Sequence, residues 1–490
     1  MATLSQTLPR QSTSGRSPRR TLLNTAAIFS GEAVSRLATA LMALLVARRF
    51  GAEALGQYGY ALSLASVLVI VPDLGLHLLT TRSLAAEPQR LARTFWNLHV
   101  LKIPLASAVV LFTVFFGEWT IRDDGRRLLL YVLVARAMLQ TFSLAYMAIF
   151  KAFERMHYIA MAQIVNALFV IACVGAAMGL SLAAPLVVAS FLAGQAAETW
   201  FCWRILHREF SPGGFTGLDR RLLRSMMLGA LPIGITAVLQ ALNLRLDVLI
   251  LGIFTSNEGL GHFQAAAWFV IGPFLGASLL MTVLFPRLSR LLRAPSAQGS
   301  AYVESLVKLA FLSMALVALM IWLVAPHLLN LTFGRDLAPA ASLLRILAPA
   351  LPCVFLNTVL FYVFVAARRR TAYLATLLLG LMVGTALAFF LAPRFGPAGS
   401  AAADVVREII MTASFLYFLC REGLAPEAGK TLLKLLVGAS MLCVAGAACA
   451  GNSVGESWPA VWILLLIAGT LALSGIPRRH DLRLVLNEEP

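Results

Sequence analysis

The sequence predicts an all-α integral membrane protein with about 14 transmembrane helices, in two pseudo-symmetric six-helix bundles followed by a C-terminal helix pair. Three observations predict this fold. Of the 490 residues, 59% are hydrophobic and only 13% are charged, whereas soluble domains have about 25% charged residues. The apolar residues fall into long runs separated by short basic gaps, and parts of the first half recur in the second.

The apolar runs have the length that a bilayer requires. A hydrocarbon core about 30 Å thick is crossed by about 20 helical residues. The runs that meet this length cover residues 21–47, 55–81, 94–117, 127–150, 157–180, 183–206, 222–251, 258–285, 305–326, 339–366, 371–392, 398–420, 431–450 and 459–476.

Lysine and arginine gather in alternate gaps, for example within residues 204–224 and 368–370. The positive-inside rule therefore places these gaps and both chain ends in the cytoplasm. The net charge of +17 reflects this orientation. It forms no continuous basic stripe, so no nucleic-acid partner is predicted. The six cysteines include no CxxC pair, and neither a disulfide framework nor a metal site is indicated.

One short stretch occurs twice. FGAEALGQY begins at Phe50 and FTSNEGLGHF at Phe254, so that Tyr58 matches Phe263. Further along, FERMHYIA from Phe153 resembles ARRRTAYLA from Ala367. Because six spans return the chain to the same side of the membrane, two such copies insert in parallel, related by an axis along the membrane normal.

The repeat divides the chain into parts. The N-terminal apolar run is too long for a signal-peptide core, which favours a membrane span over a cleaved leader. The predicted parts are a disordered basic cytoplasmic tail (1–20), an N-terminal bundle (21–206), a Gly/Pro-containing cytoplasmic linker (207–221), a C-terminal bundle (222–420), an extra helix pair (421–476) and a cytoplasmic tail (477–490).

Polar residues inside the spans are the candidate functional groups. An ionisable side chain near the bilayer centre costs about 2.5–3.5 kcal/mol, so it is expected to face a cavity or a partner. Glu32 and Arg36 share a face of the first span, and Gln240, Asn243 and Asp247 share a face of the seventh. We expect both faces to border a water-filled cleft between the bundles.

Some of these residues have two interpretations. Glu32 and Arg36 fit a structural ion pair as well as a cavity lining, because they are four residues apart. Asp404 and Arg407 in the twelfth span are predicted to be a structural pair. His77 is predicted to be a satisfied polar residue, with a proton relay as the alternative. Arg136 and Arg245 have no oppositely charged neighbour three or four residues away, so a functional role is predicted for both.

The residues at this point resemble a known family. NTAAIFSGEAVSRLATALMALLVARRFGAEALGQYGYALSL from Asn24, together with the Asp73-Leu74-Gly75-Leu76 element, is similar to the opening of polysaccharide-type lipid-linked oligosaccharide flippases, which transport O-antigen or exopolysaccharide repeat units. Their superfamily also includes multidrug antiporters and lipid II flippases. The resemblance implies two bundles around a central cavity that opens alternately to each side of a bacterial inner membrane. The implied cargo is a polyprenyl-diphosphate-linked oligosaccharide, moved to the outer leaflet for lipopolysaccharide or exopolysaccharide biosynthesis.

Such a cargo suggests roles for the polar residues. Arginine binds phosphate oxygens through paired, charge-assisted hydrogen bonds, so Arg36, Arg136 and Arg245 are expected to hold the diphosphate. Gln140, Gln240 and Asn243 are expected to bind sugar hydroxyls. The carboxylates that could carry a coupling cation are Glu32, Asp73 and Asp247. No Walker-type motif is present, so ATP is not the expected direct energy source, and neither a cofactor nor an enzymatic activity is predicted.

Two other functions compete with this one. A cation-coupled multidrug antiporter of the same superfamily would need an acidic cavity, which the basic residues disfavour. A membrane glycosyltransferase, ligase or polymerase of the same pathway would need a large external loop, and the predicted external loops are short. Membrane lipid and the polysaccharide polymerase and assembly proteins are the expected neighbours of the flippase.

Overall fold

The computed structural model describes residues 18–425, apart from residues 122, 182, 215, 216, 218, 294 and 295. For residues 18–37, 120 and 178 it describes the backbone alone. The described residues form helices and connecting loops, with no strand among them. The predicted helix pair at 431–450 and 459–476 lies outside the described residues. The chain forms two compact units, Met1–Leu249 and Ile250–Pro490.

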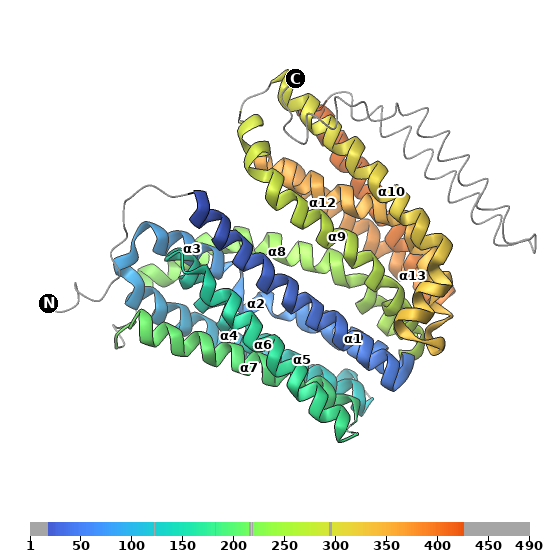
Figure 1. The fold of residues 1–490 in the computed structure, drawn as a ribbon, viewed down its shortest axis with the longest axis horizontal. Helices are drawn as coiled ribbons and strands as arrows, with labels where there is room; N and C mark the ends of the chain where they lie inside the picture. The colour runs from blue at the N-terminus through green and yellow to red at the C-terminus, as the bar shows by residue number, and fades with distance from the viewer. Residues whose placement is uncertain are drawn as a thin grey trace, which may run out of the picture. The chain divides into compact units, whose positions relative to one another are not determined.

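The helices follow the predicted spans closely. In the first unit they are α1 (Pro18–Leu68), α2 (Ile70–Asp73), α3 (Leu76–Ala86), α4 (Leu91–Thr120), α5 (Asp124–Ala152), α6 (Met156–Gly179), α7 (Ala184–Glu209) and the greater part of α8 (Arg220–Phe254), with a 3₁₀ turn η1 at Pro88–Arg90 (Figure 1). In the second unit they are α9 (Asn257–Leu291), α10 (Ala297–Phe333), α11 (Ala340–Leu347), α12 (Leu351–Ala366) and α13 (Arg370–Arg421), with 3₁₀ turns η2 (Arg335–Leu337) and η3 (Ala348–Ala350).

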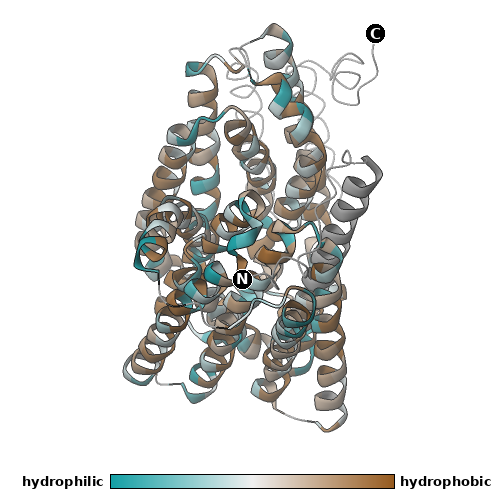
Figure 2. Cartoon of the chain, turned by 90° about the vertical axis from the view of Figure 1, so that its left-hand side faces the viewer, coloured by the Kyte–Doolittle hydropathy of each residue, from teal (hydrophilic) through white to brown (hydrophobic). Residues whose placement is uncertain are grey.

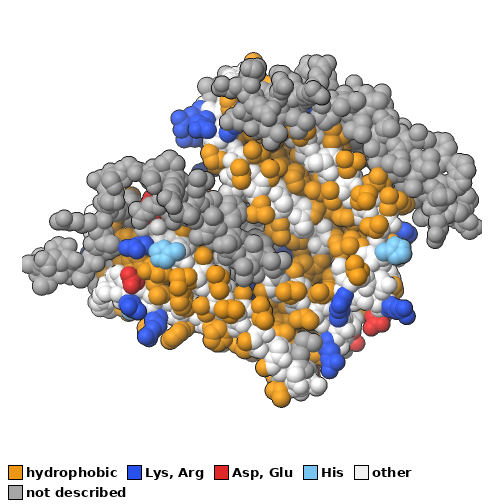
Figure 3. All heavy atoms as spheres, viewed as in Figure 1, with side chains coloured by type: hydrophobic (Ala, Val, Ile, Leu, Met, Phe, Trp, Pro, Cys, Tyr) orange, Lys and Arg blue, Asp and Glu red, His pale blue; other side chains and the backbone are white. Residues whose placement is uncertain are grey.

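The helices suit a bilayer. Nine helical stretches in the described part are long and apolar enough to cross a membrane. Hydrophobic residues line most of their length and hydrophilic residues gather towards the loops (Figure 2). Large apolar side chains such as Leu111 and Phe115 of α4 are exposed, and the face in Figure 3 is mostly hydrophobic, with Lys and Arg near its margins. Apolar surface of this extent is what lipid tails cover.

The first of the doubled corners lies inside α1. Gly51 has φ +78° and ψ −170°, and it separates the first predicted span from the second. A residue with a Cβ is strained at such a φ, which explains the glycine. The tripeptide Arg49-Phe50-Gly51 recurs as Arg394-Phe395-Gly396 in α13, where Gly396 has φ +58°. Both long helices are therefore two spans joined at a glycine corner.

The second copy of the corner is built differently. Helix α8 ends at Phe254, and Ser256 caps α9 by accepting a hydrogen bond from the backbone N–H of Gly259 at 3.2 Å. A serine in this position satisfies a donor that the first turn leaves unpaired. Tyr58 and Phe263, the matched aromatic residues of the two corners, are both fully buried.

The second predicted span is broken rather than continuous. Helix α2 ends at Asp73, Leu74 has φ +40° and Gly75 has φ +81°, and α3 begins at Leu76. A Cβ on Gly75 would lie 2.6 Å from Cγ2 of Ile233, and one on Gly234 would lie 2.6 Å from the carbonyl oxygen of Leu74. The break thus depends on close backbone contact with α8, which hydropathy along the sequence does not reveal.

The core of the first unit includes the start of α8. Leu76, Leu98 and Ala145 from α3, α4 and α5 pack against Met226 and Ala230 of α8. The boundary between the compact units therefore falls within α8, at residue 249. The sequence-derived boundaries at residues 206 and 222 describe a repeat, and they stay a prediction.

The linker between α7 and α8 is anchored to the first unit. Phe210 lies in the core beside Phe150, and the indole N–H of Trp96 donates to the carbonyl of Gly213 at 3.3 Å. Asp219 accepts hydrogen bonds from the backbone N–H groups of Leu222 and Arg221, which lower the pKa of its carboxyl. The start of α8 is thereby capped and held.

Candidate functional site

The sequence-predicted site residues lie on four helices of the first unit. Glu32 and Arg36 belong to α1, where their side chains are outside the described residues. Asp73 ends α2, and Arg136 and Gln140 lie one turn apart on α5. Gln240, Asn243, Arg245 and Asp247 all lie on α8, before the unit boundary at residue 249.

Two of the predicted arginines approach one phenol. Tyr58 of α1 is 1% exposed, and its hydroxyl has no hydrogen-bond partner among the residues that the structure describes. Both Arg136 of α5 and Arg245 of α8 lie within electrostatic range of it. A buried hydroxyl without a partner is uncommon in proteins. The first unit thus brings two cations from separate helices to an unsatisfied polar group.

Arg136 is held by aromatic packing. Its guanidinium carbon lies 5.1 Å from the ring centroid of Phe191 in α7, which is a cation–π distance. Its Nε is buried and has no hydrogen-bond partner. Glu198 of α7 is close enough to act on it electrostatically. Among the described residues, however, neither Arg136 nor Arg245 takes part in an ion pair within 4.0 Å, so both retain hydrogen-bonding capacity.

Helix α8 carries several of the predicted site residues. The side-chain amide of Asn243 donates to the carbonyl of Leu239 at 2.9 Å, and Gln240 is half-buried. Asp247 lies within electrostatic range of Arg245 despite facing a different side of the helix. The helix therefore carries amide, cationic and carboxylate groups within two turns.

A buried carboxylate network next to Arg136 has no counterpart in the sequence prediction. The side-chain amide of Asn166 in α6 donates to Glu198 at 2.7 Å, and that of Gln195 donates to Glu198 at 3.0 Å and to the hydroxyl of Ser143 at 3.1 Å. A glutamate in an apolar span indicated such a site. Gln195 lies one helical turn from Glu198, but Asn166 and Ser143 lie on other helices, at positions that helical periodicity does not predict.

Asp73 has a partner that the sequence did not suggest. Lys102 of α4 donates from Nζ to Asp73 Oδ1 at 2.6 Å, to the Thr141 carbonyl at 2.8 Å and to the Thr141 hydroxyl at 3.1 Å. Nδ1 of His77 contacts the second carboxylate oxygen. In the sequence, the indication of this contact was Lys102, a single lysine inside the apolar run at 94–117. His77 is satisfied by Asp73, in agreement with the prediction.

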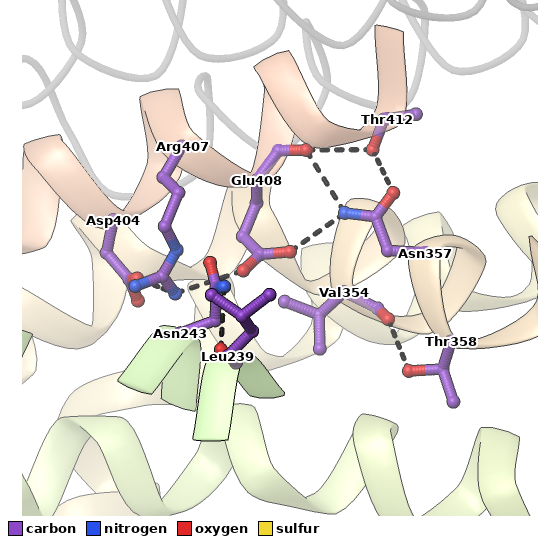
Figure 4. A network of polar contacts seen from close by, with 9 residues as sticks. All are labelled: Leu239, Asn243, Val354, Asn357, Thr358, Asp404, Arg407, Glu408 and Thr412. Atoms are coloured by element: carbon purple, nitrogen blue, oxygen red, sulfur yellow. Dashed lines mark hydrogen bonds and ion pairs between the residues drawn. The ribbon is translucent and has the colours of Figure 1, made fainter. Parts of the chain in front are cut away.

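The second unit holds a comparable network (Figure 4). Arg407 of α13 is ion-paired with Asp404, as predicted, and its Nη2 lies 3.0 Å from Oε1 of Glu408. The side-chain amide of Asn357 in α12 donates to Oε2 of Glu408 at 2.9 Å, and Thr412 donates to Asn357 at 2.8 Å. One arginine thus lies between two carboxylates, and the asparagine and threonine complete their hydrogen bonding, as expected of a structural cluster.

Glu198 and Glu408 occupy matching places in the sixth and twelfth predicted spans. Each is buried, and each accepts a hydrogen bond from an asparagine amide. The two units differ in the cation: Arg407 pairs directly with Glu408, whereas Arg136 forms no ion pair among the described residues. The comparable glutamates favour a repeat, and the difference is that the buried arginine beside Glu198 forms no ion pair within the part of the chain that the structure describes.

The family description of polysaccharide biosynthesis proteins matches residues 21–292, more than half of the chain. The chain belongs to this family. The description of the lipid II flippase MurJ matches residues 274–469. No curated protein matches the chain.

Solved structures show the same fold as this polysaccharide biosynthesis family member. Lipid II flippase MurJ in an inward closed conformation is 15% identical, with a TM-score of 0.67 over 94% of this chain and 100% of that one. An inward-facing multidrug resistance MATE family transporter of the MOP superfamily is 15% identical, with a TM-score of 0.60 over 81% of this chain and 98% of that one. A MOP superfamily transporter from Pyrococcus furiosus is 15% identical, with a TM-score of 0.55 over 85% and 99%. At this identity the likeness concerns the fold alone.

Proposed function

We propose that this family member is an alternating-access flippase that moves a polyprenyl-diphosphate-linked oligosaccharide from the cytoplasmic to the outer leaflet of the inner membrane, for cell-surface polysaccharide biosynthesis. The observation that most directly supports this proposal is that Arg136 and Arg245 approach the buried Tyr58 hydroxyl, while neither is ion-paired among the described residues. Such guanidinium groups are suited to a diphosphate, because they bind its oxygens through charge-assisted hydrogen bonds.

The cargo explains why a polar site belongs in a membrane protein. A diphosphate sugar is too polar to cross hydrocarbon, while its polyprenyl tail remains in lipid. Arg36, Arg136 and Arg245 bind the diphosphate in this proposal, and Gln140, Gln240 and Asn243 bind sugar hydroxyls. Relative movement of the two units would present the site first to the cytoplasm and then to the outside, with both chain termini in the cytoplasm.

The proposal also includes carboxylates that could bind a coupling cation. Glu32 and Asp247 remain candidates for a coupling cation. At Asp73, the ammonium of Lys102 already occupies the position next to Oδ1 that a metal cation would take. A proton is therefore the better candidate at Asp73, since it can bind the cluster without displacing Lys102.

A leaflet assay tests the proposed function. The purified full chain is reconstituted in liposomes with a polyprenyl-diphosphate disaccharide that carries an NBD fluorophore, and dithionite reports the fluorophore that has reached the outer leaflet. We expect Arg136→Glu and Arg245→Glu to slow transport at least tenfold, because a hydrogen bond to a charged group contributes about 1.5–3 kcal/mol. Arg204→Glu, at an exposed arginine of α7 beside Trp200, should transport normally.

Two results would reject the proposal. One is transport by the Arg136 and Arg245 variants at the wild-type rate. The other is an equal rate for NBD-phosphatidylcholine, which lacks the diphosphate. Export of ethidium in place of the sugar lipid would instead identify a multidrug antiporter. A sugar lipid that stays on the inner leaflet but is converted to polymer would point to an enzyme of the pathway.

A further inference from the structure

The break in the second span is joined across its two sides by one side-chain cluster. Asp73 is the last residue of α2, and His77 lies in the first turn of α3. Their side chains bond to each other across Leu74 and Gly75, and Lys102 attaches the same carboxylate to α4. The left-handed conformation of Leu74, at φ +40°, is unfavourable for a leucine and needs such support.

The break also contacts the helix that connects the two units. The backbone of Leu74 and Gly75 lies against Ile233 and Gly234 so closely that neither glycine leaves room for a Cβ. Pro232 precedes this contact and interrupts the hydrogen bonding of α8. Helix α8 starts in the first unit and ends in the second.

The three side chains of the cluster differ in their charge balance and in their access to water. Lys102 has three acceptors for its three donors, and its side chain is 1% exposed. Asp73 is also buried, and the two charges neutralise each other. The His77 side chain is 28% exposed. Water therefore reaches His77, and an imidazole that donates through Nδ1 has a second nitrogen that can accept a proton.

Among the side chains that the structure describes, the other titratable groups near the cluster come from α4 and α5. His99 of α4 lies within electrostatic range of Lys102. It hydrogen-bonds the carbonyl of Phe95 at 2.8 Å and the hydroxyl of Tyr146 in α5 at 3.1 Å. It makes no contact with Asp73. Helix α8 lies against the break through Ile233 and Gly234 and packs on Leu76 of α3 through Met226 and Ala230, all of which are uncharged.

We propose that His77, Asp73 and Lys102 form a proton-controlled latch, in which a proton on His77 fixes the break of the second span against α8 and its release loosens the break. The proton comes from water and binds Nε2 of the neutral imidazole. Nδ1–H continues to donate to the Asp73 carboxylate, and the cluster gains one positive charge. The bond from neutral His77 already has an ionised acceptor, and protonation makes the donor ionised as well, so that an ion pair is added to the hydrogen bond and α2 and α3 are held together more firmly.

The latch is tested without substrate, by hydrogen–deuterium exchange of the full chain in lipid nanodiscs at pH 5.5 and 7.5, corrected for the chemical exchange rate. The readout is the peptide that covers residues 70–86. In the wild type we expect exchange about tenfold slower at the lower pH, because the ion pair formed by an imidazolium adds to the hydrogen bond that a neutral imidazole already makes to the carboxylate. His77→Gln should exchange fast at both pH values, and His77→Arg slowly at both.

The matched control is His99→Gln, which removes an imidazole on the neighbouring helix and should keep the wild-type pH dependence. The proposal is overturned if the wild type shows no pH dependence in this peptide, or if His77→Gln retains it. Should His77→Arg fail to fold, His77→Gln and His99→Gln still decide the question. The latch would serve the proposed flippase, but its test is independent: a chain that transports the NBD sugar lipid without pH-dependent exchange has the function and lacks the latch.

Discussion

Removing the charge of Asp73 is the sharpest test of the way in which the first unit is held together. The variant Asp73→Asn keeps the shape of the side chain but leaves the ammonium of Lys102 buried without its counter-charge. At the 2.6 Å separation of Nζ and Oδ1, the attraction is about 6 kcal/mol for an effective dielectric constant of about 20. Because the asparagine oxygen and Thr141 still accept hydrogen bonds, we expect a net loss of about 3–5 kcal/mol in the free energy of unfolding.

The complementary variant should cost less. Lys102→Met leaves Asp73 with His77, which can take up a proton and supply the missing positive charge, so we expect a loss of about 1–3 kcal/mol. The double variant Asp73→Asn/Lys102→Met removes both charges and fills the space with apolar atoms. Buried ion pairs replaced in this way are often neutral in stability, so the double variant should be more stable than Asp73→Asn alone.

The free energies are measured by titration with dodecyl sulfate in mixed micelles, following reagent access to the thiol of Cys202, which is fully buried in the first unit. Lys308→Met, at a half-buried lysine of α10, is the control and should change the stability by less than about 0.5 kcal/mol. The reasoning is refuted if Asp73→Asn loses less than about 1 kcal/mol, or if the double variant is as unstable as the worse of the single ones.

Three further predictions concern close contacts and a helix cap. Gly234→Ala should lower the melting temperature in detergent, because its Cβ would lie 2.6 Å from a backbone oxygen, whereas Gly272→Ala, with nothing within 4 Å, should leave it unchanged or raise it slightly. Gly384→Ala should also destabilise, since its Cβ would lie 2.6 Å from Cδ of Arg407, whose guanidinium is fixed by ion pairs; an unchanged melting temperature would mean that the arginine can move. The lowered pKa of Asp219 means that its cap on α8 is present above the ordinary carboxyl pKa and is lost as the pH falls through the lowered one. Amide exchange at the start of α8, corrected for the chemical exchange rate, should therefore accelerate on acidification, and Asp219→Ala, which removes the acceptor, should exchange fast at every pH.

The sequence by itself determined the membrane class and the places of the spans within the described residues. Span length is set by bilayer thickness and composition by the lipid around it, and both are local properties of the chain. The corner at Gly51 was also visible, because a glycine between two apolar runs permits the positive φ that the reversal needs. Of the site, sequence reasoning selected Arg136 and Arg245 because they lack local partners.

The partners of the buried charges were decided by the tertiary structure. Lys102 meets Asp73, and Tyr58 lies near Arg136 and Arg245, across distances in sequence that have no periodicity. The break at Leu74 and the packing of α8 against the first unit likewise arise from contacts with other helices. Hydropathy measures the preference of each residue for lipid, but a buried charge is stabilised by particular groups at particular distances, and only the packed helices supply those.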